Sequence, residues 1–337
     1  MASDLAVPTH ILDIAFAFRR SKTLLTAVEL GLFAALAEQP REAKSLAQHL
    51  GLHGRGAEDF FDALVALGLL VRDVGGRYAN TAESARFLDP SKEDYIGHAL
   101  HRVSTRVYSN WNSLASALRT GQPQSGAFGA GGYGALYADA SGLEAFLRAM
   151  TGSSLMFARA LAVTFPWKQY GRVVDIGSAE GCVPVQIARA HPHMIGGGFD
   201  LPAVEPWFTR YVERNGLSHR LLFHAGDFHR DPLPSADVMV MGRVLHNWSL
   251  PVKKMLLSKA HESLPQNGAL IICETLIDDA RQTVSDALFA SLHMLIETAD
   301  GFEATGAEYT DWLEATGFRD VHILKLGCAQ SAIVGVK

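Results

Sequence analysis

The stretch Arg172-Val-Val-Asp-Ile-Gly-Ser-Ala-Glu-Gly-Cys-Val-Pro-Val-Gln-Ile-Ala-Arg189 decides the fold of this chain. A short β-branched run ends at Asp175, small residues follow at Gly177 and Gly181, and an amphipathic segment begins directly afterwards. This order predicts a strand, a tight turn and the N-terminus of a helix, with which α/β sheets hold nucleotide-like ligands. Small residues let the backbone approach a ligand closely, because a Cβ atom would block it.

The turn lacks the fingerprint of dinucleotide-binding proteins, which needs glycine at the first, third and sixth positions. Counted from Gly177, those positions hold glycine, Ala179 and Cys182. The pattern is instead Asp-x-Gly-x-(small)-x-Gly, and a plain strand-to-helix turn whose glycines serve packing alone is the alternative. The turn therefore indicates a nucleotide-type site and leaves the ligand open.

Composition limits the class of protein. The chain has 337 residues, of which 48% are hydrophobic, so two domains with a large core are expected. A net charge of −5 argues against a nucleic-acid partner. The three cysteines have no paired or metal-type spacing, which favours a reducing cytoplasm. Because no apolar run approaches the ~20 residues that span a bilayer, we expect a cytoplasmic protein without membrane contact.

The sequence pattern of the N-terminal residues 11–79 predicts a winged-helix arrangement. Apolar residues recur at helical spacing over residues 11–36, and further helices are expected over 43–50 and 57–67. Residues 69–72 and 77–79 flank a Gly-Gly pair and predict a β-hairpin.

Winged helices often bind DNA, but the last predicted helix argues against that function here. Its exposed positions include Glu58, Asp59 and Asp62, whose carboxylates would repel phosphates. The apolar surface of the N-terminal helices is better explained by contact between subunits, so we expect a homodimer. Residues 1–95 are therefore predicted to form a winged-helix dimerisation domain.

Residues 96–165 are predicted to form a helical connector and pocket wall. The glycine-rich stretch 121–134 carries Phe128 and Tyr133, and Tyr137 follows it. A surface loop is one interpretation of this stretch. A lid or pocket wall for an apolar ligand is the other.

Residues 166–337 are predicted to form an α/β domain, because strands and helices alternate as in a parallel sheet covered on both faces. The last two strands are joined by a short turn and can only pair antiparallel. The predicted fold class is therefore a Rossmann-like α/β sheet with a C-terminal antiparallel hairpin, which is typical of methyltransferase-type sheets and not of dinucleotide-type ones, beside a mostly helical N-terminal domain. The predicted strands are 173–176, 198–200, 221–224, 237–241, 270–274, 321–326 and 331–336.

Three successive strands end in an acid, at Asp175, Asp200 and Asp227. Asp200 follows Gly181 by 19 residues, close to the ~20 at which an acid reaches the hydroxyls of a ribose. Asp227 can accept a hydrogen bond from an adenine amino group, with Phe228 against the ring face. Because parallel strands end at one edge, these acids predict a nucleoside site there.

The chain resembles the S-adenosylmethionine-dependent O-methyltransferases of the plant caffeate and bacterial polyketide type. The likeness covers nearly the whole chain and implies S-adenosylmethionine as cofactor, a winged-helix dimerisation domain, and methylation of a hydroxyl on an aromatic small molecule in secondary metabolism. It rests on four segments: Val174-Asp-Ile-Gly-Ser-Ala-Glu-Gly181, Gly198-Phe-Asp-Leu-Pro202, Gly226-Asp-Phe228 and Val244-Leu-His-Asn-Trp248.

The resemblance also implies roles for single residues. His246 matches the general base, and Glu274 and Glu303 match the acids that orient it. The implied cofactor contacts are Asp175, Gly177, Asp200, Leu201, Asp227, Phe228, Gly242, Arg243, Met150 and Ser154. The implied acceptor pocket contains Met294, Thr298, Trp248 and His293.

The chain departs from the family pattern at several positions. Ala179 replaces a usual glycine, and Asn247 stands where aspartate is commoner. Gly242 and Ala304 occupy positions where some members carry basic residues. Because these basic residues are missing, we expect another residue to contact the cofactor carboxylate, and Arg243 is the candidate.

A histidine with a pKa near ~6.5 can take a phenol proton at neutral pH, and a carboxylate partner fixes its tautomer. Other interpretations stay open. His246 is an ordinary core histidine in one of them, and in another the chain binds the cofactor without methylating. A third is carbon or nitrogen methylation, assisted by a metal between His246 and His293, with Glu297 nearby. No close ligand spacing such as His-x-Glu-x-His occurs, so we predict no resident metal.

Overall fold

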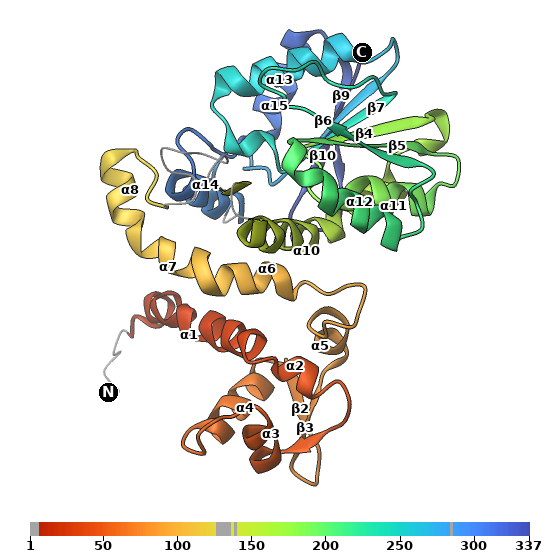
Figure 1. Ribbon diagram of the computed structural model, residues 1–337. Coiled ribbons are helices and arrows are strands. Elements are labelled where there is room, and N and C mark those ends of the chain that lie inside the picture. The colour runs from red at the N-terminus through yellow and green to blue at the C-terminus, as the bar shows by residue number, and fades with distance from the viewer. Residues whose placement is uncertain (1–6, 126–135, 138–139, 284–285) are drawn as a thin grey trace. The chain divides into compact units, whose positions relative to one another are not determined.

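The computed structural model describes residues 7–125, 136–137, 140–283 and 286–337 (Figure 1). The chain divides into two compact units, residues 1–109 and 110–337. The predicted connector is therefore shared, with residues 96–109 in the first unit and 110–165 in the second. Phe128 and Tyr133 of the predicted lid lie outside the described residues.

The first unit is helical and carries a small antiparallel sheet. Gly31 adopts a left-handed conformation, with φ at 69°, and separates the first two helices. The helices are α1 (Thr9–Glu29), α2 (Leu32–Ala35), α3 (Ala43–His49), α4 (Ala57–Ala66), α5 (Ala82–Phe87) and α6 (Gly97–Arg102), followed by a π-helical turn, Val103–Val107.

The sheet of the first unit has the order β1 (Arg41–Glu42), β3 (Arg77–Asn80) and β2 (Leu70–Arg72), so the predicted hairpin gains a third strand. That strand is only two residues long and leaves no alternating pattern in the sequence. Phe61 of α4 and Tyr78 of β3 are fully buried, and their ring centroids lie 5.4 Å apart. The Tyr78 hydroxyl donates to Asp62 Oδ1 at 2.7 Å.

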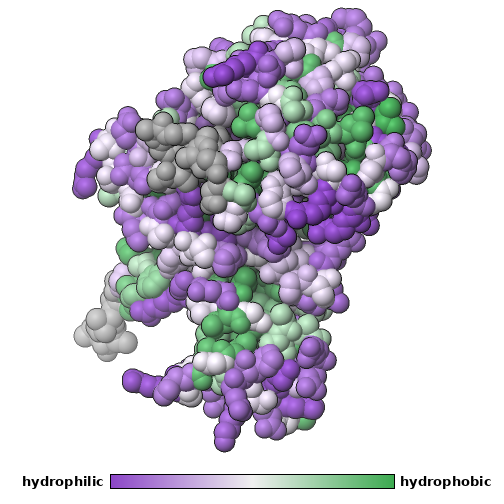
Figure 2. Space-filling model, viewed as in Figure 1, coloured by the Kyte–Doolittle hydropathy of each residue, from purple (hydrophilic) through white to green (hydrophobic). Residues whose placement is uncertain are grey.

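Helix α1 exposes apolar side chains in the described part of the first unit. Ile11, Ile14 and Phe18 are 67%, 65% and 53% exposed, and hydrophobic atoms gather over this helix in Figure 2. A contiguous exposed apolar surface indicates a contact with another molecule.

The second unit is built on a seven-stranded sheet whose strands lie at the predicted positions, apart from the start of β5. The pairs from β6 to β8 are parallel, and β10 runs antiparallel to both β8 and β9. The order is β6 (Leu221–Ala225), β5 (Ile195–Asp200), β4 (Arg172–Ile176), β7 (Val238–Gly242), β8 (Ala269–Glu274), β10 (Ser331–Val336) and β9 (Arg319–Lys325). The predicted fold class is confirmed.

Strand β5 begins at Ile195 instead of the predicted Gly198. Gly196 and Gly197 are weak strand formers, so the sequence pattern did not include them, although their neighbours in β4 and β6 bring them into the sheet. Strand order reverses at β4, which lies between β5 and β7, and such switch points are where open α/β sheets bind ligands.

Helices cover both faces of this sheet (Figure 1). Alternate residues of β4 face opposite sides, because Val174 packs with α13 (Leu250–Ser263) and α15 (Gly306–Thr316), whereas Val173 packs with α10 (Ala140–Thr164) and α11 (Cys182–Ala190). The other helices of this unit include α8 (Leu114–Thr120), α12 (Glu205–Arg214) and α14 (Asp286–Glu297). No helix in the described residues is long and apolar enough to cross a bilayer.

Candidate active site

The turn between β4 and α11 is held in a conformation that requires small residues. Gly177 and Gly181 have φ values of 74° and 89°. A Cβ atom on Gly177 would lie 2.8 Å from Val244 Cγ2, so this position lacks space as well as conformational freedom for a side chain. Ala179 also adopts positive φ, at 49°, which costs about 1 kcal/mol and explains why glycine suits this position better.

Asp200 connects that turn to the end of β5. Its Oδ2 accepts from the Ala179 N–H at 2.9 Å, and its Oδ1 accepts from the Leu201 N–H at 2.8 Å. Burial raises the pKa of Asp200 to about 6, while these two bonds and one from the Tyr137 hydroxyl oppose the rise. The group therefore remains ionised at neutral pH and can accept further hydrogen bonds.

Asp175 is buried beside Asp200 at the end of β4. Burial raises its pKa well above the usual range, and the negative charge of Asp200 raises it further. Both effects favour the neutral form of this carboxyl relative to that of an exposed aspartate.

Asp227 and Phe228 follow β6 at the same sheet edge. The Asp227 carboxylate accepts from the His229 N–H at 2.9 Å. The Phe228 ring meets the Trp248 ring edge-on, with centroids 5.7 Å apart, and His229 lies 4.6 Å from Trp248. Trp248, which the resemblance puts in the acceptor pocket, therefore lies beside the residue predicted to hold adenine.

Gly242 is the last residue of β7, and Arg243 follows it, across the switch point. A Cβ on Gly242 would lie 2.8 Å from the Phe157 ring, so the position is closed to any side chain while α10 packs there. Arg243 Nη1 is buried and has no hydrogen-bond partner among the described residues. A buried guanidinium N–H without a partner indicates a place for an anionic group.

Met150 and Ser154 are half-buried on α10. This helix is attached to the glycine turn, because Thr151 Oγ1 donates to Glu180 Oε2 at 2.7 Å. Burial raises the pKa of Glu180. The attachment was missed in the sequence, where Thr151 and Glu180 lie in separate segments without a shared pattern.

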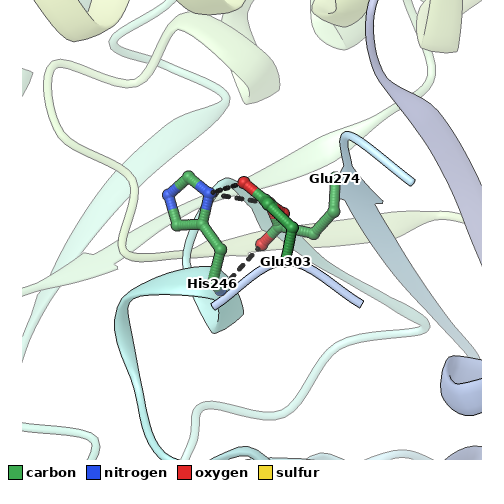
Figure 3. Close-up of side chains that lie close together, drawn as sticks. All are labelled: His246, Glu274 and Glu303. Carbon is green, nitrogen blue, oxygen red and sulfur yellow. Dashed lines mark hydrogen bonds and ion pairs between the residues drawn. The ribbon is translucent and has the colours of Figure 1, made fainter. Parts of the chain in front are cut away.

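His246, Glu274 and Glu303 meet at the carboxyl edge of the sheet (Figure 3). They come from the 3-10 turn Leu245–Asn247, the end of β8 and the segment before α15, and all three are buried. His246 Nδ1 lies 2.8 Å from Glu303 Oε1 and 3.3 Å from Glu274 Oε2. The backbone N–H of His246 donates to Glu274 Oε1 at 3.3 Å.

The glutamates control the charge and the tautomer of His246. Burial opposes a charge on the ring, but Glu274 and Glu303 outweigh it and raise the pKa of His246 above its usual value of 6.5. Burial also raises the pKa of Glu274 to about 7. Because Nδ1 faces the carboxylates, the neutral ring keeps its lone pair on Nε2, which points away from them (Figure 3). The arrangement can therefore accept a proton at Nε2.

Asn247 stabilises the turn that carries His246. Its Nδ2 donates to the carbonyl oxygens of Arg243 and Val244, each at 3.2 Å. An aspartate could not make these two bonds, since an ionised carboxylate has no donor. This departure from the family pattern therefore supplies backbone support.

The acceptor-pocket predictions Met294, Thr298 and His293 lie on α14 or directly after it. Met294 and Thr298 are buried, and His293 is half-buried. Thr298 Oγ1 donates to the Met294 carbonyl at 2.8 Å and accepts from the Gly301 N–H at 2.9 Å. Its hydroxyl therefore joins the end of α14 to the segment that leads to Glu303.

The metal interpretation combined His246, His293 and Glu297. Glu297 instead accepts hydrogen bonds from Asn110 Nδ2 at 2.6 Å and from Ser125 Oγ at 3.2 Å. Within the described residues, the group whose ligand atoms lie close enough for one ion is His246, Glu274 and Glu303, within 4.8 Å of one another. His293 does not belong to that group.

Known proteins resemble the chain along nearly its whole length. It is 37% identical to the tetracenomycin polyketide synthesis 8-O-methyl transferase TcmO of Streptomyces glaucescens, over 98% of this chain and 97% of that protein. It is 38% identical to the N,N-dimethyltransferase OxyT of Streptomyces rimosus, over 92% and 90%. The structure of human N-acetylserotonin methyltransferase in complex with S-adenosylmethionine superposes with a TM-score of 0.89 at 28% identity, covering 100% of this chain and 99% of that one.

Family models match both parts of the chain. The O-methyltransferase domain matches residues 111–319, and the O-methyltransferase dimerisation domain matches residues 12–90. The chain therefore belongs to the family of S-adenosylmethionine-dependent O-methyltransferases that carry an N-terminal dimerisation domain.

Proposed function

We propose that the enzyme methylates a hydroxyl of an aromatic small molecule and that His246 is the general base. The 2.8 Å contact between His246 Nδ1 and Glu303 Oε1 carries the proposal, because it leaves Nε2 free to accept the hydroxyl proton. Two relatives are named as an 8-O-methyl transferase of tetracenomycin polyketide synthesis and an N-acetylserotonin methyltransferase, and these names support this acceptor class and a place in natural-product biosynthesis.

The residues at the sheet edge fit S-adenosylmethionine. The Asp200 carboxylate would accept from the ribose hydroxyls. The buried Nη1 of Arg243, to which no described residue bonds, would bind the carboxylate of the methionine part. Asp227 and Phe228 would hold the adenine, at the same sheet edge as the turn that contains Gly177. Bound there, the cofactor supplies an electrophilic methyl group on a positively charged sulfur.

The protein then acts on the acceptor. Nε2 of His246 takes the hydroxyl proton as the acceptor oxygen attacks the methyl group. Proton transfer to a positioned base contributes about 100- to 10,000-fold to the rate. Glu274 and Glu303 stabilise the imidazolium that forms. Because this cluster is buried, water is excluded and the electrostatic contribution of the carboxylates is larger than it would be in solvent.

We also infer a homodimer formed through the first unit. The dimerisation domain covers α1, whose exposed apolar side chains need a partner surface. Light scattering should give twice the chain mass of 36.5 kDa. A monomer at micromolar concentration would contradict the inference.

Nitrogen methylation is the second candidate, because the relative OxyT is named an N,N-dimethyltransferase. A screen of matched aromatic acceptors, each offered as the hydroxyl and as the amine, separates the two reactions when the product is identified by mass spectrometry and NMR. We expect O-methylated products. Methylation of amines alone would overturn the proposed function.

A further inference from the structure

Lys253 is a buried lysine close to the His246 cluster. It lies on α13 with 0% of its surface exposed, although the next residue, Lys254, is exposed. Its Nζ donates to the Phe302 carbonyl at 2.6 Å. The same atom lies 3.3 Å from the centroid of the Phe302 ring and 5.8 Å from that of Trp312.

An ammonium group in such a position is costly unless negative charge is near, and an apolar side chain would usually pack there at less cost. The charges that face Lys253 come from three elements: Glu274 at the end of β8, Glu303 in the segment before α15, and Glu308 in α15. Burial lowers the pKa of Lys253 to about 8, against the opposing effect of these glutamates. The side chain therefore stays mainly protonated at neutral pH.

The hydrogen bond of Lys253 acts on the backbone that carries Glu303. On one side of Phe302, the Gly301 N–H is held by Thr298 Oγ1 at 2.9 Å. On the other side, the Glu303 N–H donates to Ser291 Oγ at 3.4 Å, which is a long bond. Between these two bonds along the chain, Lys253 makes a shorter, charged hydrogen bond to the Phe302 carbonyl. Phe302 directly precedes Glu303, whose carboxylate contacts His246.

We propose that Lys253 is a positioning residue whose ammonium fixes the Phe302 carbonyl, and thereby Glu303, and whose charge balances the two buried carboxylates beside His246. This inference rests on the proposed role of His246. The charges that face His246 are Glu274, Glu303 and Arg243. Removing the cation of Lys253 leaves the cluster more negative, so the cluster binds a proton more tightly wherever that proton resides.

Two substitutions separate the hydrogen bond from the charge. Lys253→Met removes both, and we expect kcat to fall about 10-fold through misplacement of Glu303, with a lower Tm because the buried carboxylates lose their counter-charge and the Phe302 carbonyl loses its donor. Lys253→Gln keeps a donor for the Phe302 carbonyl and removes the charge, so kcat should recover to within about three-fold of the wild type. Lys254→Met, on the exposed side of the same helix, is the control and should behave as the wild type.

Titration of His246 by NMR of a labelled imidazole tests the charge without using activity. Both Lys253 variants should raise its apparent pKa by about half to one unit, and the control should not. In both Lys253 variants, the apparent pKa of the acid limb in the pH profile of kcat/KM should rise by the same amount. An unchanged titration and an unchanged kcat in Lys253→Met would overturn the proposal. If the titration shifts while His246→Ala keeps its turnover, the role of Lys253 stands and the assignment of the base fails.

Discussion

The glycine turn after β4 and the His246 cluster lie at the same sheet edge but are built differently. The turn consists of consecutive residues whose conformation follows from local rules, as the φ values of Gly177 and Gly181 show. In the cluster, His246 contacts residues that are 28 and 57 positions away in the chain. The turn that is predicted to hold the cofactor is thus encoded locally, whereas the candidate catalytic site depends on the whole sheet and its helices.

The two regions also differ in how their polar groups are satisfied. Asp200 in the turn region has backbone partners for both carboxylate oxygens. Glu303 Oε2 in the cluster is buried without a hydrogen-bond partner among the described residues. Because an unsatisfied buried acceptor destabilises the fold, the cluster gives up stability to keep a second carboxylate near His246. Substitutions in the turn region should therefore change cofactor affinity or fold stability, whereas substitutions in the cluster should change turnover.

The largest expected effect is that of His246→Ala on turnover. We expect kcat to fall about 1,000-fold, while the affinity for the demethylated cofactor stays within about two-fold, because the ring acts on the acceptor proton only. Single-turnover rates and calorimetry measure the two quantities. His322→Ala, which removes an exposed histidine of β9, is the control. A turnover within about five-fold of the wild type would remove His246 from the role of base.

Glu303→Gln should have the next largest effect. The amide can still accept from Nδ1, but it lacks the charge that raises the pKa of His246, so we expect kcat to fall about 10- to 100-fold. The acid limb of kcat/KM should move to lower pH, because less negative charge makes the imidazolium easier to deprotonate. The wild-type limb should lie above pH 6.5. A shift to higher pH would contradict the assignment.

Asp200→Asn tests the turn region through binding. A lost charge-assisted hydrogen bond should weaken the affinity for the demethylated cofactor about 10-fold, with kcat at saturation nearly unchanged. Since burial raises the pKa of Asp200 to about 6, wild-type affinity should also weaken as the pH falls below that value. Calorimetry at several pH values measures both. A flat pH dependence together with wild-type affinity in the variant would rule out this role.

Ala179→Gly should have the smallest effect and the opposite sign. Relief of the left-handed conformation at φ 49° should raise the free energy of unfolding by up to about 1 kcal/mol, partly offset by the flexibility of glycine in the unfolded chain. Gly177→Ala is the matched comparison and should destabilise the fold, because its Cβ meets Val244. Denaturant titrations of both variants measure the difference. Equal effects would show that backbone strain is not localised at Ala179.

Periodicity and turn chemistry were enough to predict the sheet, its antiparallel end and the turn with Asp200, since these depend on local spacing. The start of β5 was missed because Gly196 and Gly197 have no intrinsic preference for a strand. Lys253 could not be recognised, because its burial depends on the packing of α13 against the segment before α15. The resemblance suggested Arg243 as a residue, but only the fold shows that its Nη1 is buried without a hydrogen-bond partner in the part of the chain that the structure describes.

The central claim is that Glu303 acts through His246, and a double-mutant cycle tests it most directly. Single-turnover rates are compared for the wild type, His246→Ala, Glu303→Gln and the double variant, with one identified acceptor. If the two residues act as a unit, Glu303→Gln should cost about 10- to 100-fold in the wild type and less than about three-fold once His246 is absent. Equal losses in both backgrounds would contradict the account.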